Sequence, residues 1–278
     1  MKNFLKILIP FIIIFAVGYD CCRAYVFPPA PCSVPIAYNI GSFDAKFGIS
    51  KEYFLSALQD AEKVWESPSG LNLFAYEPQD TDKDVLKVNL IYDYRQQATS
   101  KLASVGVTVS QTRASYDSLK AKFLALKAEY EQERAALDQD VAAFNKHPGT
   151  ASERQELLAR QKSLNNKADE INAMVTVINR LAGELNISVD QYNTINGARG
   201  ETFEEGVFST DGTTREIDIY EFSNRAKLVR VLAHELGHAL GLPHLKDPKA
   251  IMYEFNQGNS SSLTQADLDS LKATCGIK

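Results

Sequence analysis

The sequence predicts an α+β fold in which a twisted mixed sheet of about five strands is interrupted by a long antiparallel α-helical coiled-coil hairpin. Three observations lead to this prediction. Short apolar segments with strand-like alternation occur in the first and last thirds of the chain. Residues 109–193 between them show helical periodicity instead. A histidine-rich segment that is also helical in pattern lies close to the C-terminus.

Composition narrows the class of protein. The 278 residues carry a net charge of −5, with 45% hydrophobic and 23% charged residues. These values are typical of a folded, water-soluble protein, and they exclude a chain that is disordered throughout or a polytopic membrane protein. The acidic balance argues against nucleic acid as a partner.

The first 24 residues resemble a targeting segment. Lys2 and Lys6 precede the apolar run 7–17, which is shorter than the roughly 20 residues of a membrane span. This length is typical of a signal-peptide core. We therefore interpret residues 1–24 as a signal peptide and expect a periplasmic or extracellular protein. The alternative is a retained N-terminal membrane anchor.

Export would permit disulfide bonds. Removal of residues 1–24 takes away Cys21 and Cys22 and leaves Cys32 and Cys275 near the two ends of the folded region. We therefore expect a Cys32–Cys275 disulfide that closes almost the whole domain into one loop. Two free thiols are the alternative.

Residues 25–108 begin the sheet domain. After a proline-rich start, Ile36–Ile40 alternates as a strand does. Ser50 is a good N-cap for a helix that we expect Pro68 and Gly70 to end. Two further strands are predicted at residues 73–76 and 85–92.

The middle of the chain is predicted to be a hairpin of two helices over residues 109–193. Apolar residues recur every three or four positions on both sides of the turn His147–Thr150, as in the seam of a coiled coil. The seam includes Tyr116, Leu119, Phe123 and Val141 before the turn and Leu164, Ile171 and Ile178 after it. Each helix would be about 57 Å long at 1.5 Å per residue. We expect this hairpin to fold on its own seam and to hold a protein partner or a large substrate.

Residues 194–278 complete the sheet domain. Residues 204–209 and 215–222 alternate as strands do, and a helix is predicted from Ser223 or Asn224 to Gly241. The last element begins with a capping-box pattern at Thr264–Asp267.

The strongest functional signal is the segment His-Glu-Leu-Gly-His-Ala-Leu-Gly-Leu-Pro-His at residues 234–244. On a helix, His234 and His238 lie one turn apart and face the same way. Gly241 lets the helix stop and the chain turn back, so that His244 can supply a third nitrogen. Three imidazoles with one open position are typical of a catalytic zinc site. Glu235 lies beside the first ligand and can act as general base on a zinc-activated water.

These residues resemble a known family. The segment matches HExxHxxGxxH, the signature of the metzincin zinc endopeptidases, and Asp-Pro-Lys-Ala-Ile-Met-Tyr at 247–253 is similar to the methionine turn of the matrixin branch. The resemblance implies a metzincin-like zincin domain that hydrolyses peptide bonds, with one catalytic zinc on His234, His238 and His244. It also implies that Met252 lies beneath the metal and is not a ligand. Structural calcium stays open.

The resemblance also implies a substrate cleft. The edge strand around Gly206, Val207 and Phe208 would pair with an extended polypeptide, and the residues near Tyr253–Phe255 would form the wall of the pocket for the side chain after the scissile bond. The substrate is therefore expected to be a protein or peptide. Membrane association is expected only if the N-terminal segment is retained.

Two other hypotheses compete with an active, constitutive peptidase. In the first, the hairpin makes the protein a binding or scaffold protein, and the metalloprotease domain is weakly active or inactive. Glu235 argues against this, because an inactive relic does not need the base. In the second, Cys32 caps the zinc as the cysteine switch of matrixin precursors does. The first predicted strand begins only four residues after Cys32, which leaves little chain to cross the cleft.

Overall fold

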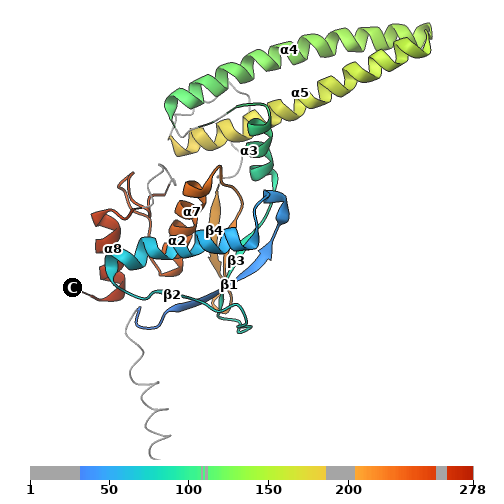
Figure 1. The fold of residues 1–278 in the computed structure, drawn as a ribbon. Helices are drawn as coiled ribbons and strands as arrows, with labels where there is room; N and C mark the ends of the chain where they lie inside the picture. Colours follow the sequence, from blue (N-terminus) through green and yellow to red (C-terminus); the bar gives the residue numbers. More distant parts are fainter. Residues whose placement is uncertain (1–31, 108, 110–111, 186–203, 255–261, 278) are drawn as a thin grey trace, which may run out of the picture.

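The computed structural model describes residues 32–107, 109, 112–185, 204–254 and 262–277. The predicted signal peptide and the expected loop after the hairpin lie outside these residues. The body of the molecule is built on one five-stranded sheet with strand order β2-β1-β3-β5-β4 (Figure 1). The strands are β1 (Ile36–Phe43), β2 (Phe74–Tyr76), β3 (Leu86–Leu90), β4 (Gly206–Thr210) and β5 (Arg215–Ile219). β4 runs antiparallel to β5 at one edge, and the other neighbouring strands are parallel.

Two helices bury the apolar side of the sheet. α2 (Lys51–Ser69) and α7 (Arg225–Ala239) contribute to one apolar cluster with inward-facing strand residues such as Tyr38, Val88 and Ile217, which are fully buried. Helix α2 ends at Ser69, between Pro68 and Gly70, which confirms the expected end of this helix. Pro68 lies in the last turn, where its lack of an N–H removes one of the final helix hydrogen bonds, and the left-handed Gly70 closes the helix.

Shorter elements complete the body. The 3₁₀ helix η1 (Ala45–Phe47) follows β1, and α8 (Gln265–Cys275) begins with the expected Thr264 capping box. The antiparallel edge strand and the mixed sheet with its helices agree with the predicted α+β class.

The arm, by which we mean α3, α4 and α5, projects from this body (Figure 1). Helices α4 (Arg113–Lys146) and α5 (Ala151–Glu184) have 34 residues each and lie side by side, which gives about 51 Å per helix at 1.5 Å per residue. The sequence assigned no element to the residues that form α3 (Tyr94–Ser104). Its Ala98 and Leu102 pack into the base of the arm, so the packing unit of the arm includes residues before position 109.

Burial in the arm is concentrated at its base. The second apolar cluster joins α3 to the near ends of α4 and α5, and includes Tyr116, Phe123 and Ile178. Val141, which we expected in the seam, is 37% exposed, and charged pairs such as Lys167 with Glu133 line the middle of the hairpin. Supercoiling of the two helices stays a prediction.

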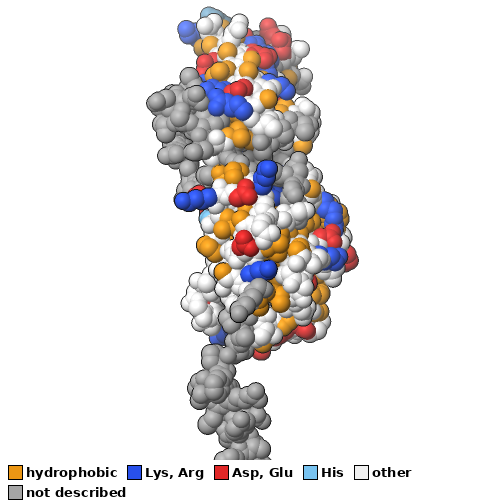
Figure 2. All heavy atoms as spheres, turned by 90° about the vertical axis from the view of Figure 1, so that its left-hand side faces the viewer, with side chains coloured by type: hydrophobic (Ala, Val, Ile, Leu, Met, Phe, Trp, Pro, Cys, Tyr) orange, Lys and Arg blue, Asp and Glu red, His pale blue; other side chains and the backbone are white. Residues whose placement is uncertain are grey.

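The surface is mixed in character. On the face drawn in Figure 2, basic, acidic and apolar side chains are interspersed over the body and over the arm. Among the described residues, no helix combines the length and the apolar character that crossing a membrane requires.

Candidate functional site

Helix α7 places two of the predicted metal ligands. Asn224 caps its start by accepting a hydrogen bond from the backbone N–H of Lys227, and every residue from Lys227 to Gly237 is buried. After His238 the chain reverses at Gly241, whose φ of +87° is left-handed, a conformation that glycine adopts without a Cβ clash. This reversal brings His244 back beside the helix.

The three imidazoles meet at one point. The Nε2 atom of His238 lies 3.1 Å from Nε2 of His234 and 3.1 Å from Nε2 of His244. His234 is buried, His238 is half-buried and His244 is exposed, so the group opens to solvent on one side. Zn–N bonds of about 2.0–2.1 Å in a tetrahedral site place two ligand nitrogens about 3.3 Å apart, close to these separations.

The hydrogen bonds of the Nδ1 atoms determine which ring nitrogens of His234 and His238 carry a proton. Nδ1 of His234 lies 2.7 Å from the carbonyl oxygen of Ile251, and Nδ1 of His238 lies 3.0 Å from that of Leu242. A carbonyl only accepts, so both Nδ1 atoms carry the proton and both neutral rings present a lone pair at Nε2. Two lone pairs that face each other at 3.1 Å repel, and a shared cation removes that repulsion. The donor set therefore fits zinc, and the carbonyls orient its ligands.

Burial favours the neutral form of these rings. It lowers the pKa of His234 to about 3 and lowers the pKa of His238 as well. Neutral imidazole is the form that binds a metal.

Glu235 lies next to His234 in a buried position. It is 5% exposed, and burial raises the pKa of its carboxyl to about 8, against the opposing effect of a hydrogen bond from the backbone N–H of Phe208. That N–H donates to Oε2 of Glu235 at 2.8 Å. Gly206, two residues earlier in β4, permits this approach, because a Cβ there would lie 2.8 Å from Val231 and 3.1 Å from Glu235.

The edge strand β4 therefore lies directly over helix α7. Phe208 packs its ring against the main core, whereas Val207 forms its register pair with Asp218 of β5. Because the N–H of Phe208 points to Glu235, it is on the side of β4 away from β5. This is the side on which an extended chain would add.

The methionine turn lies beneath the imidazoles. Met252 is fully buried, and its side chain approaches Gly237 of α7 so closely that a Cβ there would lie 2.3 Å from the sulfur. Tyr253 is half-buried and forms an isolated bridge with Leu245, next to His244. Phe255, which we expected beside Tyr253, lies outside the described residues.

Asp267 holds this turn, a role that our sequence analysis missed. Its two carboxylate oxygens accept hydrogen bonds of 3.0 Å from the backbone N–H groups of Ile251 and Met252. One oxygen also accepts from the N–H of Thr264 as part of the capping box. The capping pattern was visible in the sequence, but the second use of the same carboxylate depends on tertiary contact.

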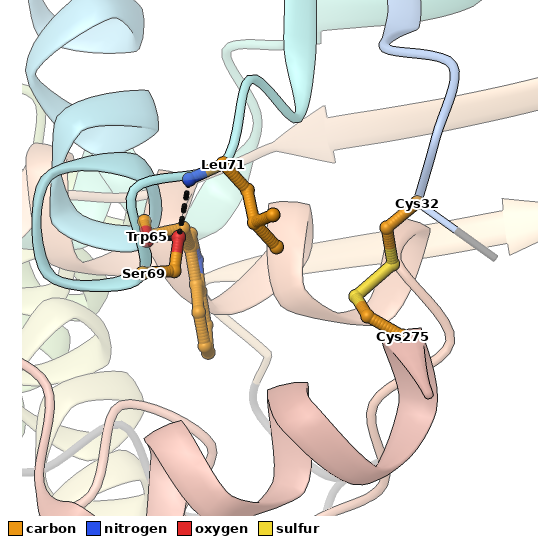
Figure 3. The surroundings of a disulfide bond; sticks show 5 residues. All are labelled: Cys32, Trp65, Ser69, Leu71 and Cys275. Carbon is orange, nitrogen blue, oxygen red and sulfur yellow. Dashed lines mark hydrogen bonds between the residues drawn. A yellow bond between two sulfur atoms is a disulfide. The ribbon is translucent and has the colours of Figure 1, made fainter. Parts of the chain in front are cut away.

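Cys32 and Cys275 are joined by a disulfide, with 5.3 Å between their Cα atoms (Figure 3). The side chain of Leu71, two residues after the end of α2, points toward it, and Trp65, in the last turns of α2, lies on the other side of Leu71. The indole N–H of Trp65 donates to the backbone oxygen of Ala233 in α7, so the same tryptophan contacts the zinc-motif helix. With its sulfur in this bond, Cys32 has no thiol to cap a metal, which contradicts the cysteine-switch hypothesis.

Comparisons with known proteins agree with this geometry. A family model described as matrixin, a peptidase family, matches residues 33–275. A segment of 53 residues is 45% identical to human neutrophil collagenase. That match covers 18% of this chain and 11% of the collagenase. The search of solved structures gave no significant match.

Proposed function

Because the chain belongs to the matrixin family of zinc-dependent peptidases, we propose that it is an exported endopeptidase that cleaves polypeptides held along β4. The observation that carries the proposal is the convergence of ring nitrogens from His234, His238 and His244 beside the buried carboxyl of Glu235. A peptide added to the free side of β4 would pass directly over this group.

The residues divide the chemistry between them. His234, His238 and His244 would hold the ion; bound zinc acidifies a coordinated water towards a pKa of about 7 and polarises the substrate carbonyl. Glu235 accepts the proton of the attacking water and delivers it to the leaving amine nitrogen. The Phe208 N–H fixes Oε2 of Glu235 and leaves Oε1 for this transfer. Met252 and Asp267 keep the floor of the site rigid.

A peptide library tests the proposal. Wild type and Glu235→Ala should each bind one zinc per chain, while cleavage by the variant falls about 10²–10⁴-fold, the usual contribution of a general base. His244→Ala should lose most of its zinc. Glu77→Ala, which changes an exposed carboxylate on the body, is the matched control and should cleave as wild type does.

Two results would contradict the peptidase. One is equal cleavage by wild type and Glu235→Ala. The other is a zinc-loaded wild type that cleaves nothing in a broad library, which would favour the scaffold hypothesis. Full zinc retention by His244→Ala would contradict the third ligand.

Export is supported by the apolar segment near the N-terminus and by the Cys32–Cys275 disulfide, which is typical of oxidising compartments. Mass spectrometry of the protein from cell fractions should find an N-terminus near Tyr25 and the disulfide-linked peptide pair. Intact Met1 in a membrane fraction would instead establish the retained anchor.

The arm is proposed to hold a protein partner or part of a large substrate away from the cleft. Its length of about 51 Å and the exposure of Leu158, 60%, near its tip support this role. Its test is the distal truncation described in the Discussion.

A further inference from the structure

A buried ion pair joins the arm to the body. Nη1 of Arg180, in α5, lies 2.7 Å from Oε2 of Glu221, just after β5. A second carboxylate, that of Glu205, lies 3.9 Å from the same nitrogen. The three side chains are 6%, 1% and 8% exposed, so the charges are removed from water and depend on one another.

The surrounding contacts are also polar. The hydroxyl of Thr99, in α3, donates to Glu221, and the side-chain oxygen of Gln96 accepts from the backbone N–H of Phe222. Among the described residues, the apolar cluster of the body and that of the arm share no member. The polar contacts therefore connect the arm and the body, which are packed around separate apolar clusters.

This link continues into β4 and to Glu235. Glu205 directly precedes β4, and its backbone oxygen accepts hydrogen bonds from the N–H groups of Tyr220 and Glu221. Three residues later, the N–H of Phe208 holds the carboxylate of Glu235. Burial lowers the pKa of Arg230, in α7, and the charges of Asp267 and Glu205 oppose this effect, so Glu205 also acts on α7.

We propose that Arg180 is a positioning residue for catalysis. From the arm, it fixes Glu205 and Glu221 at the start of β4, and through β4 it sets both the substrate-binding strand and the orientation of Glu235. This inference rests on the proposed peptidase function. It assigns to the arm a role in the cleft in addition to any partner that its tip holds.

A purely structural ion pair would stabilise the junction without affecting the geometry of β4. The structural role and the positioning role predict different results when the charges of Arg180 and Glu221 are both removed. Loss of Arg180 alone takes this cation away from the buried carboxylate of Glu221 and lowers stability, whereas Arg180→Met combined with Glu221→Gln removes most of that penalty. A structural role predicts that activity returns together with stability. A positioning role predicts that activity stays low.

The experiment measures kcat and KM on a peptide that spans the cleft, at a temperature where thermal melts show every variant folded. Arg180→Met and the double variant should keep one zinc per chain and lose about 10–100-fold in kcat/KM, since a displacement of about 1 Å can cost about 100-fold. Arg180→Lys should recover part of this loss. Lys167→Met, which removes a cation paired with Glu129 and Glu133 in the middle of the arm, should match wild type.

Hydrogen exchange provides a readout that does not depend on activity. Amides of residues 204–210 should exchange faster in Arg180→Met and in the double variant than in wild type or Lys167→Met. Faster exchange there would support the link even if wild type cleaved no peptide, a result that would overturn only the peptidase proposal. Wild-type exchange of β4 in folded Arg180→Met, or full recovery of kcat/KM in the double variant, would overturn the positioning role.

Discussion

The zinc-motif helix and the arm helices are similar secondary structures in opposite environments. In α7, every residue from Lys227 to Gly237 is buried between the sheet, α2 and the methionine turn. In α4, four of 34 residues are buried, mostly near the body. A substitution in a helix that is packed on all sides disturbs the neighbouring side chains and lowers stability, whereas most substitutions in a solvent-exposed helix change stability little. The functional site therefore tolerates less change than the arm, which lies between the two halves of the body in the sequence.

The largest expected effect comes from the support under the imidazoles. Asp267→Asn replaces one accepting oxygen by an amide that faces N–H donors, so the free energy of unfolding should fall by about 2–3 kcal/mol. Chemical denaturation measures it. Asp269→Asn, an exposed acid on the same helix, is the control and should change little. A loss below about 1 kcal/mol would mean that packing alone holds the turn.

A pair of glycines compares the two helical environments directly. Gly237→Ala would push a methyl group to within 2.3 Å of the Met252 sulfur and should destabilise the body by about 1–3 kcal/mol. Gly183→Ala, in α5, meets nothing within 4 Å and should stabilise its helix by about 0.5 kcal/mol. Thermal unfolding of each variant measures both signs. Equal effects at the two positions would contradict the contrast.

The distal arm should be dispensable for short peptides. Replacing residues 129–168 by a four-residue turn keeps the apolar cluster at the base of the arm and Arg180, so cleavage should stay within about twofold of wild type. Cleavage of a large natural substrate should fall if the tip recognises it. Replacing 112–192 instead removes Arg180 and uncovers Ala98 and Leu102, so it should lower activity and stability. Equal results from the two deletions would contradict this division of the arm.

The smallest effect concerns pH. Burial raises the pKa of Glu62, whose carboxylate accepts a hydrogen bond from Tyr38. Because the folded state binds this proton more tightly than the unfolded state, stability falls as pH rises from the unfolded pKa through the folded one. Glu62→Gln removes this loss, so its stability relative to wild type should rise between pH 4 and pH 7. Paired melts over that range test it, and a relative stability that does not vary with pH would contradict it.

Local patterns predicted much of this molecule. The strand segments, the N-caps Ser50 and Thr264 and the two helices of the hairpin are set by residues close in sequence, and they appear near their expected positions. The metal motif could be interpreted for the same reason, because its residues lie within eleven positions. Helix α3 was missed because its burial depends on α5, far along the chain.

The residues that hold the site in place could not be predicted from the sequence, because their contacts are also distant in sequence. Asp267 reaches the methionine turn across 15 residues, and Trp65 reaches α7 across 168. Arg180 reads as one more charge on a solvated helix, and its partners lie in another part of the chain. Such contacts leave no periodicity, since they depend on how finished elements pack together.

The disulfide gives the molecule an unusual covalent connectivity. It links two cysteines 243 positions apart, while the hairpin turn near Pro148 and Gly149 lies about midway along the ring so formed. A single cut of the exposed turn would open that ring without separating its parts. The two fragments, each carrying one half of the sheet, would stay one molecule until a reductant acted. Proteolysis at the tip of the arm would thus leave the two halves of the sheet domain covalently joined.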